Sequence, residues 1–186
     1  MKQWSVGGAV IESDVLAACS VDPPGPHSGV SGVLMVQNLR RGGHRDWTPP
    51  GGVIDAGEHL VGGLTREVSE ETGLTVTSWE GPLYRITAVA PGLGWTLTVE
   101  VHRALAVVGC IEVGRDPDGI VVAADLVAPD DCGPRMSGAH PWVSEPLLDW
   151  MAQRWSGTRD YAYRVEGSDP ERLRIERTEP GDFRLP

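Results

Sequence analysis

The chain has 186 residues, of which 40% are hydrophobic and 23% are charged. This length suffices for one sizeable hydrophobic core but is short for two, so one globular domain with appendages is expected. The formal net charge of −10 argues against a nucleic-acid polymer as partner, because such proteins gain affinity by neutralising phosphates with Lys and Arg.

The first fifty residues predict two strands separated by loops. Residues 4–11 are expected to form a short strand and residues 15–19 an ill-defined turn, followed by a loop over residues 22–29. Residues 30–36 predict a second, buried strand. Residues 40–52 hold two Pro and four Gly among charged residues, so a functional loop without regular structure is predicted there.

A helix is predicted over residues 60–72. Leu64 and Val68 recur at i and i+4, which places both on one helix face. Gly73 stands where a helix C-cap favours a left-handed residue.

The middle of the chain predicts further strands and a second helix. Residues 83–89 and 95–107 are rich in strand formers, and the second run is long enough for a bent or bulged strand. A turn is expected over residues 114–119, a strand over 120–127 and an amphipathic helix over 142–155. Strands interleaved with two helices indicate an α/β or α+β sandwich.

The composition changes after residue 155, where Arg and acidic residues become dense. We therefore divide the chain into a main domain, residues 1–155, and a charged C-terminal extension, residues 156–186. Residues 162–165 and 173–175 alternate apolar and charged side chains, which predicts a surface hairpin. An addition to a sheet edge, a dimer arm, a lid and a loosely attached tail all remain open.

Cysteine usage and hydrophobic patterning favour the cytoplasm. Cys19, Cys110 and Cys132 are odd in number and widely spaced, which favours neither a disulfide framework nor a thiolate zinc site. The N-terminal residues do not resemble a signal peptide, and no apolar run approaches the roughly 18 residues of a membrane span. A soluble, cytoplasmic protein without a membrane partner is expected.

Three carboxylates on the predicted helix indicate a metal site. Glu67, Glu70 and Glu71 lie at i, i+3 and i+4, so their side chains project from one face within a turn of each other. Such a cluster of like charges favours binding of a cation. Oxygen ligands without Cys or His select Mg²⁺, Mn²⁺ or Ca²⁺.

The residues before the carboxylates support the same site. Arg66 is placed to pair with one carboxylate, and Glu58 stands at the junction of loop and helix, where its charge complements the helix N-terminus. Gly51, Gly52 and Gly57 allow the loop to bend tightly and bring backbone carbonyls near the metal.

The stretch from residue 52 to residue 74, GVIDAGEHLVGGLTREVSEETGL, resembles the Nudix box, G-x5-E-x7-R-E-U-x-E-E-x-G-U with U a bulky aliphatic residue, at every specified position. Gly62 and Gly63 depart in character, because such helices usually carry good helix formers there and each glycine costs about 1 kcal/mol relative to Ala. The resemblance implies a Nudix fold, with a mixed β-sheet sandwiched between α-helices.

The resemblance also implies the metal ligands and the reaction. Glu67 and Glu71 would be the principal ligands, Glu70 a further ligand or an acceptor for coordinated water, and the carbonyl of Gly51 or Gly52 would complete the shell. The cation would be Mg²⁺, with Mn²⁺ as a substitute. The enzyme would cleave the pyrophosphate bond of a nucleoside diphosphate linked to another moiety, as in ADP-ribose, a nucleotide sugar or a (d)NTP.

The general base is less well defined than the ligands. With Arg66, Glu70 and Glu71 in the catalytic set, the base would be a box glutamate or an acidic residue of a later loop. Candidates in that loop are Glu112, Asp116 and Asp118. Asp118 ranks first because it lies immediately before the strand that is predicted to start at Ile120.

Contacts to the rest of the substrate are expected from four residues. Arg41 and Arg45 precede the box and would contact phosphates, whereas Trp47 and Trp95 would stack on a base; solvated arginines and core tryptophans are the ordinary alternative for each. The expected partner is a small-molecule nucleotide, and a homodimer is open. A catalytically silent module that senses nucleotides or mediates interactions is the alternative function, against which the intact carboxylates weigh.

Overall fold

The structure of the protein is a computed structural model that describes residues 1–16, 32–169 and 172–181. In chain order its elements are β1 (Lys2–Val10), α1 (Ser13–Leu16), β2 (Val33–Leu39), η1 (Arg41–Gly43), β3 (Arg45–Thr48), β4 (Gly51–Val53), α2 (Leu60–Thr72), β5 (Thr75–Ala90), η2 (Pro91–Leu93), β6 (Trp95–Val108), β7 (Val121–Val127), α3 (Pro129–Arg135), α4 (Pro141–Gln153), β8 (Arg159–Glu166) and β9 (Arg174–Thr178), where η marks a short 3₁₀ helix.

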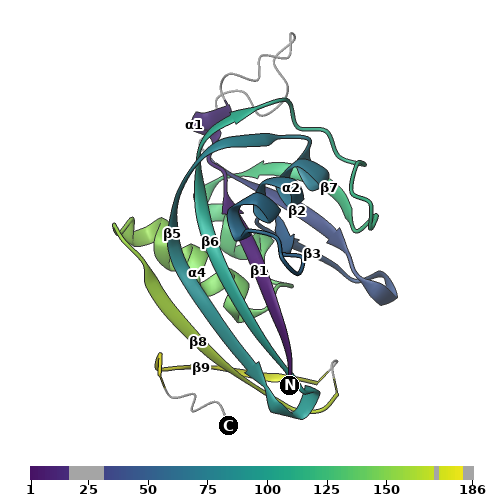
Figure 1. The fold of residues 1–186 in the computed structure, drawn as a ribbon, viewed down its shortest axis with the longest axis vertical. Coiled ribbons are helices and arrows are strands. Elements are labelled where there is room, and N and C mark those ends of the chain that lie inside the picture. Colours follow the sequence, from purple (N-terminus) through teal and green to yellow (C-terminus); the bar gives the residue numbers. More distant parts are fainter. Residues whose placement is uncertain (17–31, 170–171, 182–186) are drawn as a thin grey trace.

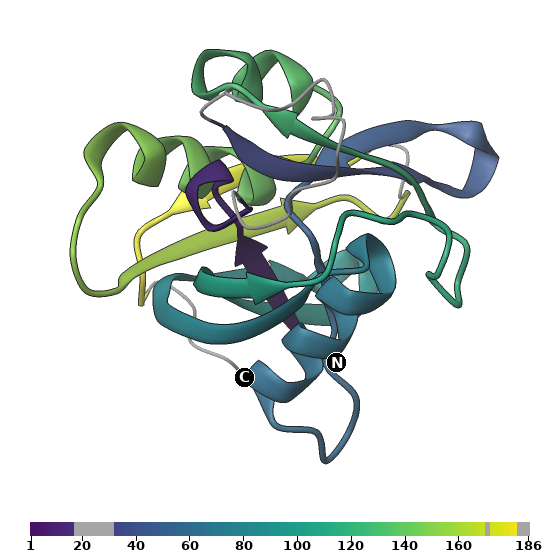
Figure 2. The ribbon, with the colours of Figure 1, turned by 90° about the horizontal axis from the view of Figure 1, so that it is seen from above.

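The larger of two sheets forms the centre of the molecule (Figure 1). Its six strands run in the order β4-β1-β6-β5-β8-β9, with parallel pairing between β1 and β6 and between β5 and β8. Helix α2 packs on β1, β4 and β5, whereas α4 packs on β5 and β8 from the other face (Figure 2). The smaller, antiparallel sheet has the order β3-β2-β7. A mixed sheet between helices is the predicted fold class, which is thereby confirmed.

Two clusters of buried side chains hold these layers together. On the α2 face, Leu64 and Val68 pack with Ala9 and Ile11 of the N-terminal part, and all four are fully buried. On the α4 face, Leu147 and Trp150 pack among side chains of β5, β6 and β8. Because side chains alternate across a strand, each central strand contributes to both clusters.

Helix α2 has the bounds predicted from the apolar spacing. Gly73 follows it with φ 77°, ψ −5°, and its N–H donates to the Ser69 carbonyl, which confirms the predicted left-handed C-cap. Residues 4–11, 95–107 and 120–127 also form strands close to the predicted bounds. The strand predicted at residues 83–89 starts earlier, at Thr75, and has register shifts on the way.

The prediction that residues 40–52 lack regular structure is wrong. β3 pairs with β2 as an antiparallel hairpin, and β4 pairs with β1. Gly42 and Gly43 adopt φ 85° and 83° at the hairpin tip, and the two prolines lie between β3 and β4. The turn-forming residues therefore separate short strands.

Two further segments differ from expectation. Residues 13–16 form the short helix α1 next to the expected turn, and helix α3 was not predicted. Residues 17–31, with the loop expected at residues 22–29 and the start of the strand expected at 30–36, lie outside the described residues. None of the helices in the described part of the chain has the length and apolar character that a membrane crossing requires.

The C-terminal extension forms the predicted hairpin, with strands longer than expected. β8 pairs with β5 from Tyr84–Arg159 to Val89–Arg164, and β9 pairs with β8 at the sheet edge. Tyr161, Tyr163 and Val165 are buried, although the extension is rich in charged residues. The hairpin thus shares the hydrophobic core with α4.

Candidate active site

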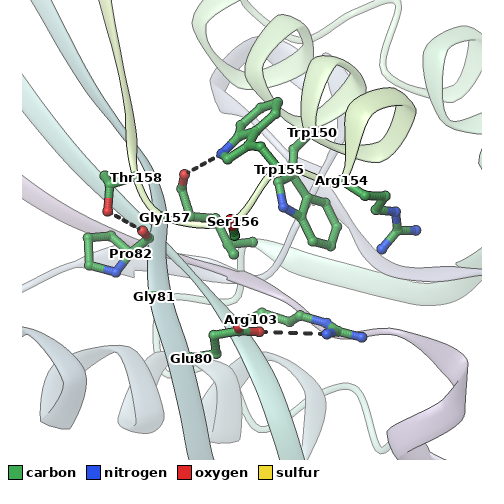
Figure 3. A pocket seen from close by; sticks show the side chains of 11 residues that line it. Glu80, Gly81, Pro82, Arg103, Trp150, Arg154, Trp155, Ser156, Gly157 and Thr158 are labelled. Carbon is green, nitrogen blue, oxygen red and sulfur yellow. Dashed lines mark hydrogen bonds and ion pairs between the residues drawn. The ribbon is translucent and has the colours of Figure 1, made fainter.

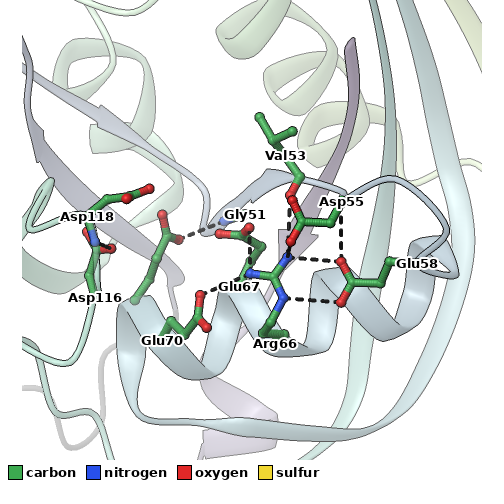
Figure 4. A network of polar contacts seen from close by, with 10 residues as sticks. Gly51, Val53, Asp55, Glu58, Arg66, Glu67, Glu70, Asp116 and Asp118 are labelled. Carbon is green, nitrogen blue, oxygen red and sulfur yellow. Dashed lines mark hydrogen bonds and ion pairs between the residues drawn. The ribbon is translucent and has the colours of Figure 1, made fainter.

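Arg66 is the centre of a polar network on α2 (Figure 4). Its Nε and Nη2 donate to the two carboxylate oxygens of Glu58, at 3.1 and 3.0 Å. Its Nη1 donates to Glu67 at 2.9 Å and to Glu70 at 3.0 Å. The guanidinium therefore ties the loop before α2 to two of the three helix carboxylates, which extends the predicted single pairing.

These ion pairs act on the pKa values of the partners. The hydrogen bond from Arg66 lowers the pKa of Glu58, and the carboxylates in turn raise the pKa of the Arg66 guanidinium. Burial raises the pKa of Glu67, although the hydrogen bond from Arg66 opposes this effect. Arg66 thus offsets part of the repulsion within the cluster.

Glu71 is the most buried of the helix carboxylates, with 9% of the residue exposed. Its Oε2 accepts a hydrogen bond of 2.8 Å from the backbone N–H of Gly51. Burial raises its pKa to about 8, with the negative charges of Glu67 and Asp116 adding to the effect. Glu71 is shielded from water and has no ion pair in the described network. A bound cation would therefore stabilise its charged form.

Glycines let the backbone approach these carboxylates. A Cβ atom on Gly52 would overlap the Glu67 carboxylate, so any other residue where β4 faces α2 must displace that carboxylate. A Cβ on Gly63 would lie 2.6 Å from Oε2 of Glu58 and 2.9 Å from Cδ1 of Ile54. A side chain at residue 63 must therefore displace Glu58 and Ile54, whereas a Cβ on Gly62 would meet open space.

The donor set fits a hard divalent cation. Carboxylate oxygens of Glu67, Glu70 and Glu71 and the backbone of β4 converge on one end of α2, and oxygen donors suit Mg²⁺ or Mn²⁺. In the arrangement of the described residues, no group of three His, Cys, Asp or Glu side chains is placed to hold a metal ion. Glu67 and Glu70 pair instead with Arg66, and Glu71 faces Gly51.

The loop before β7 approaches the carboxylates from the side opposite Glu58 (Figure 4). Asp116 accepts backbone N–H bonds from Asp118 at 2.9 Å, Ile120 at 2.7 Å and Val121 at 2.9 Å. Its charge acts on both Glu67 and Glu71. Asp116 thus holds the turn, and Asp118, which sequence analysis ranked first, is an exposed residue of that turn.

The residues predicted to contact the rest of the substrate lie on the hairpin of η1 and β3 and at the start of β6. Arg45 on β3 is exposed and donates to Gln37 at 3.2 Å, and the Arg135 guanidinium lies 4.7 Å from the ring centroid of Trp47. The side chain of Arg41 lies outside the described residues. Trp95 pairs with Lys2 of β1, and Gly52 pairs with Gly7 of the same strand. Lys2 and Gly7 are five residues apart, so Trp95 and Gly52 are separated by about 17 Å along β1.

Sequence analysis missed an aromatic cluster of Trp95, Trp142 and His140. The rings of Trp95 and Trp142 meet edge to face at 6.3 Å, and His140 stacks on Trp142 at 4.2 Å. Burial against these rings lowers the pKa of His140. The only local signal is the His-Pro-Trp run at the start of α4.

Arg40 acts electrostatically on both the aromatic cluster and the carboxylates. It pairs with Asp46 through two bonds of 3.1 and 3.0 Å. The charge of Arg40 lowers the pKa of Glu71 and also that of His140. One guanidinium therefore lies within electrostatic reach of both groups.

A cavity of about 380 Å³ lies elsewhere, between β5, β6 and the end of α4 (Figure 3). Its wall includes Arg103 and Arg154, which both pair with Glu12, at 2.7 and 2.6 Å. None of the carboxylates of α2 lines it. The candidate active site is therefore the surface of α2 and β4, and this cavity is separate from it.

Comparisons with known proteins identify the family and the fold of the chain. The NUDIX domain family model matches residues 14–150. The solution structure of the E. coli ORF135 protein has a TM-score of 0.61 at 17% identity and covers 84% of this chain and 96% of its own. A NUDIX hydrolase from Nitrosomonas europaea has a TM-score of 0.57 at 23% identity, with coverages of 81% and 90%.

A C. elegans Ap4A hydrolase, solved as a binary complex, has a TM-score of 0.52 at 18% identity and covers 79% of this chain and 96% of its own. At these identities the structures show the fold alone. A search of curated proteins gave no match. The family model spans most of the chain, including α2, which carries the carboxylates, and most of α4, which packs on the other face of the larger sheet. The protein therefore belongs to the Nudix family.

Proposed function

We propose that the protein is a Mg²⁺-dependent hydrolase that cleaves the pyrophosphate bond of a nucleoside diphosphate linked to another moiety. The observation that carries this proposal is the arrangement of Glu67, Glu70 and Glu71 on one face of α2, with Glu67 and Glu70 bonded to Arg66 and Glu71 bonded to the backbone N–H of Gly51. ADP-ribose, nucleotide sugars and (d)NTPs are the substrate classes proposed. Mn²⁺ would substitute for Mg²⁺.

Glu67 and Glu71 would hold the cation, with Glu70 and the Gly52 carbonyl as further donors. When bound, the cation would offset charge that develops on the phosphate oxygens and lower the pKa of water. Arg66 positions Glu67 and Glu70 and keeps their charges compensated when no cation is bound. Gly51 orients Glu71 through its N–H.

Asp118 is our candidate for the general base. Asp116 holds the backbone of the turn in place through three N–H bonds, so its carboxylate oxygens are already engaged. Asp118, two residues on, is exposed on the same turn and free of that task. In this role Asp118 would accept a proton from the attacking water, which would break the phosphoanhydride bond and leave a nucleoside phosphate and a phosphorylated remainder.

The aromatic cluster would bind the nucleoside end of the substrate. Trp95 is half-buried and is backed by the buried ring of Trp142, about 17 Å along β1 from the partner of Gly52, which suits an elongated substrate; Trp47 packs against the same buried cluster. Arg40 and Arg45 would supply positive charge for the phosphates between the two ends, and Arg41 remains a candidate from the sequence.

The experiment is release of phosphate or nucleotide from a panel of ADP-ribose, nucleotide sugars, dinucleoside polyphosphates and (d)NTPs. Each substrate is tested with Mg²⁺, with Mn²⁺ and with EDTA. Wild type is compared with Glu71→Gln and with Glu179→Gln, an exposed carboxylate outside the site. We expect one substrate class to be cleaved, a loss of at least about a hundredfold for Glu71→Gln, and no change for Glu179→Gln.

A nucleotide-sensing or interaction module is the alternative function. It predicts that no member of the panel is cleaved with either metal, while a nucleotide still binds to wild type in a calorimetric titration. That result would overturn the hydrolase proposal. Equal activity of Glu71→Gln and wild type would overturn the assignment of the site.

A further inference from the structure

The C-terminal hairpin, β8 with β9, contacts the η2 turn that precedes Trp95 and the helix α4 that carries Trp142. It lies beyond residue 150, where the match to the family ends. The first contact is with the turn η2, which leads directly into Trp95. A Cβ on Gly92 would overlap the carbonyl oxygen of Gly167, the residue after β8, so the two backbones touch with no room for a side chain.

The second contact is with α4, whose first turn carries Trp142. Tyr163 of β8 donates its hydroxyl to Glu145 at 2.9 Å, one helical turn after Trp142. Tyr161 donates to Asp149 at 3.0 Å, which also receives a bond of 3.3 Å from Arg177 of β9. A buried tyrosine with a paired hydroxyl fixes both the spacing and the register of the helix on the strand.

The chain between α4 and the hairpin is also fixed. The Trp155 indole N–H donates to the Leu83 carbonyl at 3.0 Å, and the Thr158 hydroxyl donates to the Pro82 carbonyl at 2.7 Å (Figure 3). Tyr163 and Val165 are fully buried, so the hairpin is packed into the core and has little freedom to shift.

From these contacts we infer that the C-terminal hairpin is a positioning element, which sets the spacing between Trp95 and Trp142 and so selects the nucleoside end of the substrate. The hairpin touches the η2 turn on one side of the ring pair and α4 on the other. The carboxylates lie on α2, which packs on β1, β4 and β5. The kinetic part of this inference rests on the proposed hydrolase function.

Gly92→Ala tests the inference most directly. The added methyl must push the η2 turn away from Gly167 and displace Trp95, while the carboxylates stay in place. We expect KM to rise at least about fivefold with kcat within about twofold of wild type, because binding is lost without loss of transition-state contacts at the metal. The near-ultraviolet circular dichroism spectrum, which reports aromatic packing, should change in the tryptophan region.

Gly133→Ala on α3 is the matched control. The same methyl there meets Leu148 at 3.7 Å, an ordinary contact, so KM and the spectrum should not change. Tyr163→Phe is the second variant, because it keeps the buried ring and loses only the bond to Glu145. It should raise KM in the same direction as Gly92→Ala by about twofold or more, even if Gly92→Ala does not fold.

An unchanged near-ultraviolet spectrum for folded Gly92→Ala overturns the inference, and so does an unchanged KM for both variants. A fall in kcat at constant KM also overturns it, since that result would place the effect at the carboxylates. If wild type cleaves nothing in the panel, the proposed function fails, and the spectra of Gly92→Ala and Gly133→Ala still decide whether the hairpin positions the two rings.

Discussion

Gly63 and Glu58 are in close contact across the start of α2: a methyl group on Gly63 would lie 2.6 Å from the Glu58 carboxylate. The same carboxylate accepts two hydrogen bonds from Arg66, which in turn binds Glu67 and Glu70. A side chain at residue 63 would therefore act on the proposed metal ligands Glu67 and Glu70 through Glu58 and Arg66.

Gly63→Ala should destabilise the protein, although alanine favours helices. The methyl would also meet buried Ile54 at 2.9 Å, and overpacking costs about 1–3 kcal/mol, which outweighs the roughly 1 kcal/mol gain in helix propensity. Gly62→Ala, with open space around it, should raise the free energy of unfolding by about 1 kcal/mol. Urea unfolding of both variants checks this; equal stabilisation by both would contradict the close contact.

Glu71→Gln should lose activity but stabilise the metal-free protein as pH rises. The folded-state pKa of Glu71 is raised to about 8 from an ordinary 4.5, so its contribution to stability is complete below pH 4.5 and is lost as pH rises through 8. Glutamine has no such loss. Relative to wild type, the variant's Tm in EDTA should rise between pH 5 and 8, by on the order of 10 °C, and then level off.

Added Mg²⁺ provides the control for this prediction. It should raise the Tm of wild type more at pH 8 than at pH 5, because the ligand must be deprotonated to bind, and it should affect Glu71→Gln little. A Tm difference between variant and wild type that stays constant from pH 5 to 8 would argue against burial as the cause of the raised pKa.

Local periodicity explains why α2 was predictable and other parts were not. The spacing of Leu64 and Val68, with Gly73 behind them, defines that helix within a few residues of sequence, and the same period places the three carboxylates on one face. The strand pairing of residues 45–48 depends on β2, and turn-forming residues on both sides concealed it. Propensity near a residue carries no information about such a partner.

The contacts in the candidate active site divide in the same way: some follow from spacing in the sequence, and others depend on how the chain folds. The pairing of Arg66 with carboxylates was predicted from adjacent positions, whereas its contact with Glu58 requires the loop to fold back on the helix. Arg40 and His140 are a hundred residues apart in the chain and come within electrostatic range only through the packing of β2, β3 and α4. No pattern in the sequence links them.

Val165→Ala should destabilise the whole protein if the C-terminal hairpin and the rest of the chain unfold as one unit. Val165 is fully buried and belongs to the core cluster shared with α4, so removal of its methyl groups should cost about 2 kcal/mol. Glu166→Gln, on the neighbouring exposed residue, should change the free energy of unfolding by less than about 0.5 kcal/mol. A main unfolding transition that Val165→Ala leaves unchanged would mean that residues 156–186 fold separately.

Asp118→Asn should lower activity without loss of stability, whereas Asp116→Asn should lower stability. Asp118→Asn removes the proposed base and should lower kcat by about a hundredfold or more on the cleaved substrate, without a shift in the urea midpoint. Asp116→Asn replaces a carboxylate that accepts three backbone N–H bonds, so it should lower the free energy of unfolding by about 1–3 kcal/mol. If instead Asp118→Asn keeps its kcat while Asp116→Asn loses activity at unchanged stability, Asp116 is the base. The raised pKa of Glu71, to which the Asp116 charge contributes, would then reflect a catalytic pair across the cleavage site.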